Sequence, residues 1–325
     1  MITTRSPRTA RSAAACVGAI LWAVGGAQAC ELCAIYSATE LHEHRAGVVL
    51  GVSEQYTHAG TLQRDGAGTA NPAGERLDDV RTQLLLDDNL TRRFGVELSL
   101  PIIARSFRRA EAHGVVSGDE SGIGDLSLLA HFLAVNTVTD DSILRLTLLG
   151  GLKLPSGSAH RLKEELQQPP PGQMLVATGV HGHDLALGSG STDGILGAEA
   201  FTSWRRLFVG GRVHYALRSG GDFHYHYADA ITWSAGPGMF AWIAHGGTVA
   251  LQALLSGESK GKDTVRGLPE DSSAFTTLYA GPAIVYTWAP AFAADLAVDV
   301  PAFTNNTGLQ TVPDVRLRAG LSWQF

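Results

Sequence analysis

Two cysteines and two histidines close to the N-terminus are the residues of this chain best suited to chemistry. Cys30 and Cys33 are separated by two residues, and His42 and His44 follow shortly after them. Two close cysteines in an oxidising compartment usually form a disulfide, whereas thiolates and imidazoles together could bind zinc or copper. The spacing resembles no zinc finger well, so we expect an oxidised pair or a plain tail. A metal site, or a lipid attached to Cys30, are the alternatives.

Histidine pairs also occur further along the chain, as His181 with His183 and His224 with His226. Side chains two residues apart share a face of an extended segment, so each pair could chelate a metal. Both pairs lie in long segments that we expect to be loops, where a solvated histidine is the more common case. We therefore predict solvated side chains at these positions, and no cofactor for the protein.

The sequence contains neither a G-x-S-x-G nucleophile turn nor an H-E-x-x-H zinc motif. Ser158, His160 and Asp184 lie in expected loops, but residue types without geometry do not define a catalytic triad. We therefore predict that the protein is not an enzyme. A hydrolase with a few reactive residues at the rim of its fold is an alternative.

The first 29 residues have the features of a secretory signal peptide. Arg5, Arg8 and Arg11 form a basic start, an apolar stretch follows over 13–26, and Ala27-Gln28-Ala29 offers small residues at a cleavage site. We expect this segment to be cleaved, so that the protein is secreted through the inner membrane. The expected division is a signal peptide, a periplasmic segment with Cys-x-x-Cys and one folded domain, over 1–29, 30–46 and 47–325.

The composition excludes two classes of protein. The 325 residues are 45% hydrophobic and 17% charged, which is too apolar for a disordered chain. The formal net charge of −6 argues against a nucleic-acid binder, because such a protein needs a basic surface to neutralise phosphates. The 38 glycines suit an all-β chain that is rich in turns.

Apolar and polar residues alternate along most of the remaining chain, which is the signal of a strand with one apolar and one polar face. Near the C-terminus, for example, Arg316 and Arg318 alternate with Val315 and Leu317. The alternation predicts about twelve strands, near 47–58, 79–90, 94–106, 123–136, 143–155, 191–203, 207–218, 229–243, 247–256, 274–287, 291–303 and 313–325.

A soluble sandwich and a transmembrane barrel would share this alternation, but the expected connections separate the two. Long connections are expected near 59–78, 107–122, 156–190, 219–228, 257–273 and 304–312. Short turns are expected between them. Outer-membrane barrels have short periplasmic turns and longer outer loops, and a sheet in lipid must close to leave no backbone group unpaired. We therefore predict an all-β fold, an antiparallel transmembrane β-barrel of about twelve strands in the bacterial outer membrane.

The end of the chain and its aromatic residues agree with a barrel. The last segment ends on Phe325, and a terminal aromatic residue resembles the signal that barrel assembly machinery reads in outer-membrane proteins. Trp204, Trp288, Trp323 and Phe107 fall near strand ends, as expected for residues at the lipid–water interface. Outer-membrane lipids and lipopolysaccharide are therefore expected partners, and nucleic acid is not.

The polar face of the strands would line the lumen of such a barrel. Its charges are mixed, with a small basic excess that hints at a preference for anions. The candidate lumen or permeation residues are Arg81, Asp87, Glu97, Asp125, His131, Arg145, Lys153, Arg212, His214, Arg218, Asp295, Asp299, Arg316 and Arg318. Of these, Asp125 and Lys153 are expected near one rim together with Asp193. There they would form a structural ion-pair cluster, or alternatively a constriction.

Three glycine-rich stretches carry a family resemblance: 122–128 (GIGDLSL), 151–157 (GLKLPSG) and 187–193 (LGSGSTD). In order and spacing they resemble the outer-membrane transporter family named for the MetA pathway of phenol degradation, over about residues 80–325. The resemblance implies a barrel that passes small molecules, in some members linked to the breakdown of aromatic compounds. It implies no catalytic residue, and it leaves Cys30 and Cys33 outside the matched part.

Together these features predict an outer-membrane channel or transporter for passive passage of small solutes, including hydrophobic or aromatic ones. A barrel scaffold is the first alternative, with a metal- or redox-responsive Cys/His tail that engages a periplasmic partner. The rim hydrolase is the second.

Overall fold

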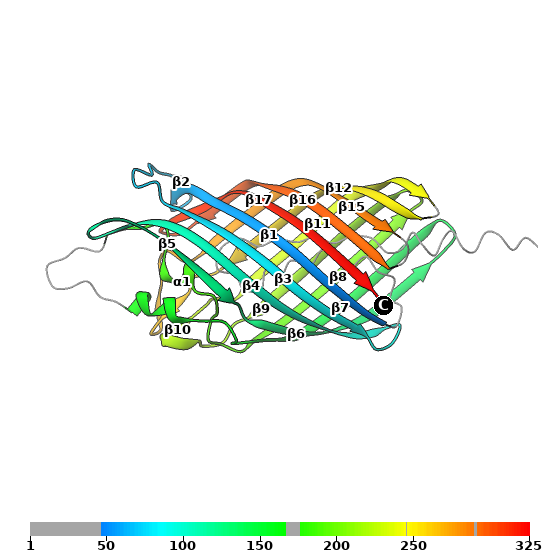
Figure 1. The fold of residues 1–325 in the computed structure, drawn as a ribbon, viewed down its shortest axis with the longest axis horizontal. Helices are drawn as coiled ribbons and strands as arrows, with labels where there is room; N and C mark the ends of the chain where they lie inside the picture. The colour runs from blue at the N-terminus through cyan, green and yellow to red at the C-terminus, as the bar shows by residue number, and fades with distance from the viewer. Residues whose placement is uncertain (1–46, 167–175, 245, 289–290) are drawn as a thin grey trace, which may run out of the picture.

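The structure is a computed structural model, and it describes residues 47–166, 176–244, 246–288 and 291–325. Within these residues, twelve antiparallel strands form one barrel, which closes because the last strand pairs with the first from Val49–Gln324 to Arg64–Leu309 (Figure 1). The strands are β1 (Gly47–Arg64), β3 (Arg76–Asn89), β4 (Phe94–Glu111), β6 (Leu126–Val138), β7 (Ser142–Leu154), β8 (Asp193–Trp204), β9 (Leu207–Leu217), β11 (Ala230–Ala244), β12 (Gly247–Lys260), β15 (Phe275–Trp288), β16 (Phe292–Asn306) and β17 (Leu309–Gln324). The predicted fold class is confirmed.

Shorter elements gather at one end of the barrel, which we call the loop end (Figure 1). They are β2 (Ala67–Gly68), β5 (Gly114–Ile123), η2 (His160–Leu166), α1 (Gly182–Leu185), η3 (Asp222–His224), β10 (Tyr225–His226), β13 (Thr264–Val265) and β14 (Leu268–Pro269). The opposite end, where β17 finishes, carries the short connections and is called the turn end.

Two of the six long connections predicted from the sequence are wrong. Within 107–122, β4 continues to Glu111 and β5 pairs with it, so that only residues 112–113 connect the two strands. Most β5 residues are exposed, so this strand lacks the apolar face that makes a strand visible in the sequence. Within 304–312, only residues 307–308 connect β16 to β17, because buried polar residues such as Gln310 and Thr311 already belong to β17.

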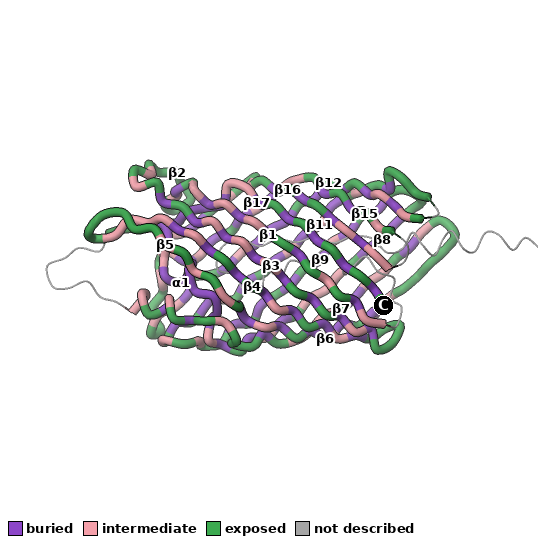
Figure 2. Tube along the Cα trace, in the orientation of Figure 1, coloured by how far each residue is buried: buried purple, intermediate pink, exposed green. Residues whose placement is uncertain are grey.

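The alternation of the strands divides the barrel into an apolar outside and a polar inside. Along β3 and β4, buried and exposed or half-buried residues alternate almost without interruption (Figure 2). The exposed face includes large apolar side chains on every strand of the barrel, for example Leu84 on β3, Leu98 on β4 and Leu296 on β16. Such a continuous apolar belt is the surface that lipid covers. Among the described residues, no helix has the length and hydropathy needed to cross a bilayer.

Aromatic residues surround the turn end on the outside of the barrel. Trp204, Trp288 and Trp323 are each about half exposed or more, at the ends of β8, β15 and β17. The backbone N–H of Phe325 donates to the carbonyl of Val48 at 2.9 Å, so the chain end seals the seam between β17 and β1. Phe107 differs from the prediction: its ring is buried at the loop end beside Leu77 and does not face lipid.

Candidate functional site

The structure places the candidate lumen residues on the inner face of the barrel or at its loop-end rim. Thirteen of the fourteen are buried, and Arg145 is half-buried, with its Nε donating to Asn136 Oδ1 at 3.3 Å. The buried ones are Arg81, Asp87, Glu97, Asp125, His131, Lys153, Arg212, His214, Arg218, Asp295, Asp299, Arg316 and Arg318. The predicted metal or disulfide residues, Cys30, Cys33, His42 and His44, lie outside the described residues.

Buried arginines gather on adjacent strands and form what we call the arginine wall: Arg81, Arg105, Arg316 and Arg318. The register of the sheet explains their proximity, because Arg316 on β17 pairs with Thr57 on β1, which in turn pairs with Asp79 on β3. Asp79 then pairs with Arg105 on β4. Every second residue of a strand faces inward, so the next inward-facing positions are two residues further towards the turn end on β17 and β3. These positions are Arg318 and Arg81, which both pair with Gln55 of β1.

The arginine wall holds more guanidinium groups than carboxylates. Asp299 Oδ2 lies 2.8 Å from both Arg316 Nη2 and Arg318 Nη2, and Asp79 Oδ2 accepts from Arg105 Nε at 2.6 Å. Asp295, one row further towards the turn end, is a third buried carboxylate. Within the described residues, Nε and Nη1 of Arg318 donate no hydrogen bond, although both are buried. A buried donor without a partner is costly, so this is a place to look for a ligand.

Neighbouring strands hold the arginine wall in place. The guanidinium carbon of Arg316 lies 3.9 Å from the ring centroid of Tyr279 on β15. Arg316 Nη2 also donates to Ser256 Oγ on β12 at 2.8 Å. The stacked ring and the hydroxyl fix the plane of this guanidinium group, which keeps its charge directed at the lumen.

A second cluster lies at the loop-end rim and contains the residues of the three glycine-rich motifs. Lys153 Nζ lies 2.5 Å from Asp125 Oδ2 and 3.1 Å from Asp193 Oδ2. Arg218 Nη1 lies 2.8 Å from the same oxygen of Asp193. Asp125 also accepts the backbone N–H of Gly157 at 2.8 Å. These buried charges are paired with one another, which favours the structural role predicted for them over a constriction.

The glycines of these motifs allow the base of the 156–190 segment to cross itself closely. A Cβ on Gly157 would lie 2.5 Å from the carbonyl oxygen of Leu187, and a Cβ on Gly188 would lie 2.5 Å from that of Gly157. Only residues without a side chain can approach so closely. The motifs therefore position the segment over the lumen.

On the strands between these clusters, lumen charges are also paired. His131 Nε2 lies 2.8 Å from Asp87 Oδ1, and Arg212 Nη2 lies 2.7 Å from Glu199 Oε1. Further inward carboxylates, among them Glu258 of β12, join Glu199 in the lumen. They offset the basic excess that we inferred for the lumen as a whole, so the positive charge is local to the arginine wall.

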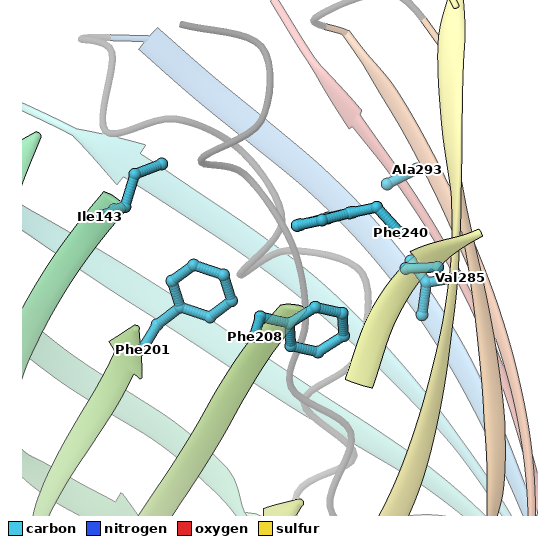
Figure 3. Close-up of a cluster of buried hydrophobic side chains, with 7 residues drawn as sticks. Ile143, Phe201, Phe208, Phe240, Val285 and Ala293 are labelled. Carbon is cyan, nitrogen blue, oxygen red and sulfur yellow. The ribbon is translucent and has the colours of Figure 1, made fainter. Parts of the chain in front are cut away.

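An apolar cluster lines one side of the lumen at the turn end. Ile143, Phe201, Phe208, Phe240 and Val285 form a buried cluster from strands β7, β8, β9, β11 and β15, and their side chains point into the barrel (Figure 3). The ring centroids of Phe201 and Phe208 are 5.8 Å apart, and those of Phe208 and Phe240 are 5.1 Å apart. We call these five residues the turn-end apolar cluster.

The described parts of the 156–190 segment, residues 156–166 and 176–190, pack inside the loop end of the lumen. Leu162 and Leu185 are completely buried. The carbonyl oxygen of Gly179 accepts from the backbone N–H of Thr311 at 2.7 Å. Glu75 Oε2 accepts from Gly179 N at 2.9 Å and from Thr178 Oγ1 at 2.5 Å. Only non-covalent contacts of this kind join the described parts of the segment to the wall.

The prediction of solvated histidines is wrong for the pair in this segment. The side chain of His183 is 2% exposed and that of His181 is 15% exposed, and their rings stack with centroids 5.1 Å apart. Burial alone would lower the pKa of His183, but the carboxylates of Asp184 and Glu165 outweigh it and raise the pKa to about 9. The other pair behaves differently: His226 is exposed, and its Nε2 lies 3.3 Å from the carbonyl oxygen of Arg218.

The residues considered for a hydrolase do not form one site. Ser158 Oγ lies 2.8 Å from His160 Nδ1, and both groups are exposed. Asp184 instead accepts the backbone N–H of His181 at 2.9 Å. Asp184 is thus engaged within its own helical turn and not with His160.

Several lumen residues escaped the sequence analysis. Arg105 shares a face with Glu97 and Ser99, but the intervening Ile103 hides the polar run. Phe201 shares a face with Glu199 and Ser203 on β8. An aromatic residue on the otherwise polar face of a strand is the signal that could have revealed the turn-end apolar cluster.

A closed twelve-stranded antiparallel barrel with an apolar outside and a charged inside has the fold of a bacterial outer-membrane protein. No protein-family model matches the chain, and no curated protein matches it. The resemblance to the family named for the MetA pathway therefore remains a prediction from its motifs.

Solved structures support the fold. An outer membrane channel from Pseudomonas putida F1 is similar with a TM-score of 0.55 and 16% identity, over 86% of this chain and 96% of that chain. The β domain of the Bordetella autotransporter BrkA has a TM-score of 0.47 and 10% identity, over 86% and 100% of the two chains. The CymD monoaromatic hydrocarbon channel has a TM-score of 0.37 and 10% identity, over 88% and 90%. Of these three, only the first is similar enough to support an argument, and it supports the outer-membrane barrel fold alone.

Proposed function

We propose that the protein is an outer-membrane channel for small organic anions that carry an apolar group, such as aromatic carboxylates. The observation that carries the proposal is the arginine wall, where buried N–H groups of Arg318 face the lumen without a hydrogen-bond acceptor among the described residues. A guanidinium group binds a carboxylate through parallel hydrogen bonds, and rings of arginine favour anions in pores.

The apolar part of the solute is suggested by the turn end of the same lumen. At the turn end, Phe201, Phe208 and Phe240 line the lumen on strands other than those of the arginine wall, so a solute that passes from the wall to the turn end would reach their level. Aromatic rings pack well against one another in offset or edge-on arrangements. A solute with a carboxylate at one end and a ring at the other could therefore contact both regions in turn.

Passage requires the described residues 176–190 to move away from the wall, because the arginine wall is buried in the conformation described here. Arg105 Nη1 donates to the carbonyl oxygen of Ala186 at 2.5 Å, so this segment lies directly on the wall. A carboxylate could replace that carbonyl as the acceptor. Solute binding and opening of the segment would then be coupled through one side chain.

We assign the loop end to the cell exterior and the turn end to the periplasm, as in other outer-membrane barrels. The apolar belt would contact membrane lipids, and the rim charges of the loop end would meet lipopolysaccharide. Phe325, which is 72% exposed, would serve as the contact for the barrel assembly machinery. Removal of Phe325 should then lower the amount of folded barrel in outer-membrane fractions.

Liposome swelling tests the proposal. Proteoliposomes containing the purified protein are placed in iso-osmotic benzoate, acetate, benzylamine or glucose, and the swelling rate is measured by light scattering. We expect benzoate to give the fastest swelling above empty liposomes, then acetate. Equal rates for benzoate and benzylamine would contradict the preference for anions, and no swelling with any solute would contradict the channel.

A further inference from the structure

The cluster of His181, His183 and Asp184 at the loop end has a geometry that solute passage does not explain. His181 Nδ1 lies 3.5 Å from Asp184 Oδ2, and His183 Nε2 lies 3.6 Å from Asp184 Oδ1. One ligand atom from each of the three residues can be chosen so that all lie within 4.8 Å of one another. Two imidazole nitrogens and one carboxylate therefore lie close enough together to share one small metal ion.

The spacing suits a small metal ion. Ligand atoms at about 2.0–2.1 Å from a tetrahedral zinc ion lie roughly 3.4 Å from each other. The two histidine–aspartate distances, 3.5 Å to Oδ2 and 3.6 Å to Oδ1 of Asp184, are each close to this value, and a rotation of the carboxylate would present one oxygen to both histidines. The distance between the histidines is at most 4.8 Å, and a small rotation of the His181 ring, the most exposed of the three side chains, would shorten it.

Glu165 of η2 orients one of the histidines. Its Oε1 lies 2.9 Å from His183 Nδ1 and accepts the backbone N–H of the same residue at 2.8 Å. Donation from Nδ1–H to Glu165 leaves Nε2 of a neutral imidazole with its lone pair directed at Asp184. A carboxylate behind a histidine ligand is the usual arrangement at metal sites, where it fixes the ring and raises its basicity.

The second histidine has a poorly satisfied nitrogen on the same side. Nδ1 of His181 is buried and makes no well-formed hydrogen bond among the described residues. A buried nitrogen without a well-formed hydrogen bond is costly. This nitrogen is also the one that lies 3.5 Å from Asp184, on the side where the three side chains converge.

We propose that His181, His183 and Asp184 bind a divalent transition-metal ion such as Zn²⁺, with Glu165 as the residue that positions His183. Imidazole and carboxylate ligands suit zinc and its neighbours better than calcium or magnesium, which prefer all-oxygen sites. Three protein ligands leave one position for water or a further group.

The site would stabilise the segment that fills the loop end. Its ligands lie at the start of α1, and Glu165 connects them to η2. His183 also stacks on Tyr225 with centroids 5.8 Å apart, and Tyr227 Oη donates to its carbonyl oxygen at 3.1 Å. A bound ion would therefore join η2 and α1 to the β10 region, and hold the segment in the conformation described here.

Metal titration tests this site on its own. The protein is purified without a histidine tag, stripped with chelator, and carries Cys30→Ser, Cys33→Ser, His42→Ala and His44→Ala to remove the tail as a competing site. We expect one Zn²⁺ per chain by elemental analysis, and a four-coordinate visible spectrum with Co²⁺. Asp184→Asn and His183→Ala should abolish both signals, whereas His113→Ala, at an exposed histidine of the loop end, should change neither.

Two further variants separate metal binding from folding. His181→Gln removes the most exposed ligand and should abolish the Co²⁺ spectrum while the barrel keeps its heat-modifiable mobility. Glu165→Gln should retain one ion per chain but raise the dissociation constant for Zn²⁺ by about 10–100-fold, as loss of a supporting carboxylate does. Absence of Zn²⁺ from the stripped and reloaded protein, or binding by His181→Gln and Asp184→Asn that equals binding by the protein with all three ligands, would show that the cluster is an ion-pair network only.

Discussion

The two ends of the lumen are built from the same strands but solve different physical problems. At the loop end, inward positions carry charges such as Lys153 and Arg316, each held by carboxylates on neighbouring strands. At the turn end, equivalent positions carry Phe201, Phe208 and Phe240. Buried charge must be paired to offset desolvation, whereas rings fill space without that requirement. For the proposed channel, this comparison predicts that the loop end would discriminate solutes by charge and the turn end by shape.

The largest expected effect comes from breaking the rim cluster. Lys153→Met removes the cation between Asp125 and Asp193, and loss of one partner from a buried pair costs about 3–5 kcal/mol. We expect a loss of that size in the free energy of unfolding, measured by urea titration in lipid vesicles. Lys262→Met, which breaks an exposed pair with Asp271, should change stability by less than about 1 kcal/mol. Equal losses for the two variants would show that the rim cluster is not a structural element.

The next effect concerns closure of the loop end. Glu75→Ala removes the acceptor of Gly179 N and Thr178 Oγ1, and hydrogen bonds to a charged group are worth about 1.5–3 kcal/mol each. We expect the open fraction in single-channel recordings to rise by at least about tenfold, which corresponds to 1.4 kcal/mol. The matched control is Glu54→Ala, at an exposed glutamate of β1. An unchanged open fraction in Glu75→Ala would mean that the 156–190 segment does not close the lumen.

A smaller effect tests the turn end. Phe208→Ala removes the residue of the turn-end apolar cluster that contacts both Phe201 and Phe240. An aromatic pair is worth about 0.5–1.5 kcal/mol beyond its buried area. The ratio of benzoate to acetate swelling rates should fall about 2–10-fold, with acetate itself unaffected. Phe303→Ala, on the outer face of β16, provides the control. If that ratio falls as far in the control as in Phe208→Ala, the turn-end apolar cluster does not contact the solute.

Much of the barrel could be predicted from the sequence, because a strand between lipid and a polar lumen must alternate. Most strand positions follow from that alternation, and the side that Arg81 or Asp299 faces follows with them. Partners across the sheet do not follow, since Arg316 and Asp79 come together only through the register of β1. β5 was missed because it lacks an apolar face. The burial of His183 was missed because the fold of the 156–190 segment depends on contacts with distant residues such as Tyr225.

The most direct test of the proposed function is the reversal potential of the reconstituted protein under a sodium benzoate gradient across a planar bilayer. It is recorded for the unchanged protein, for Arg318→Gln and for Arg205→Gln, which removes the same charge from an exposed turn-end position. A Glu75→Ala background favours the open state. We predict selectivity for benzoate that falls in Arg318→Gln and persists in Arg205→Gln. Selectivity for sodium, or a reversal potential that Arg318→Gln leaves unchanged, would contradict passage of anions along the arginine wall.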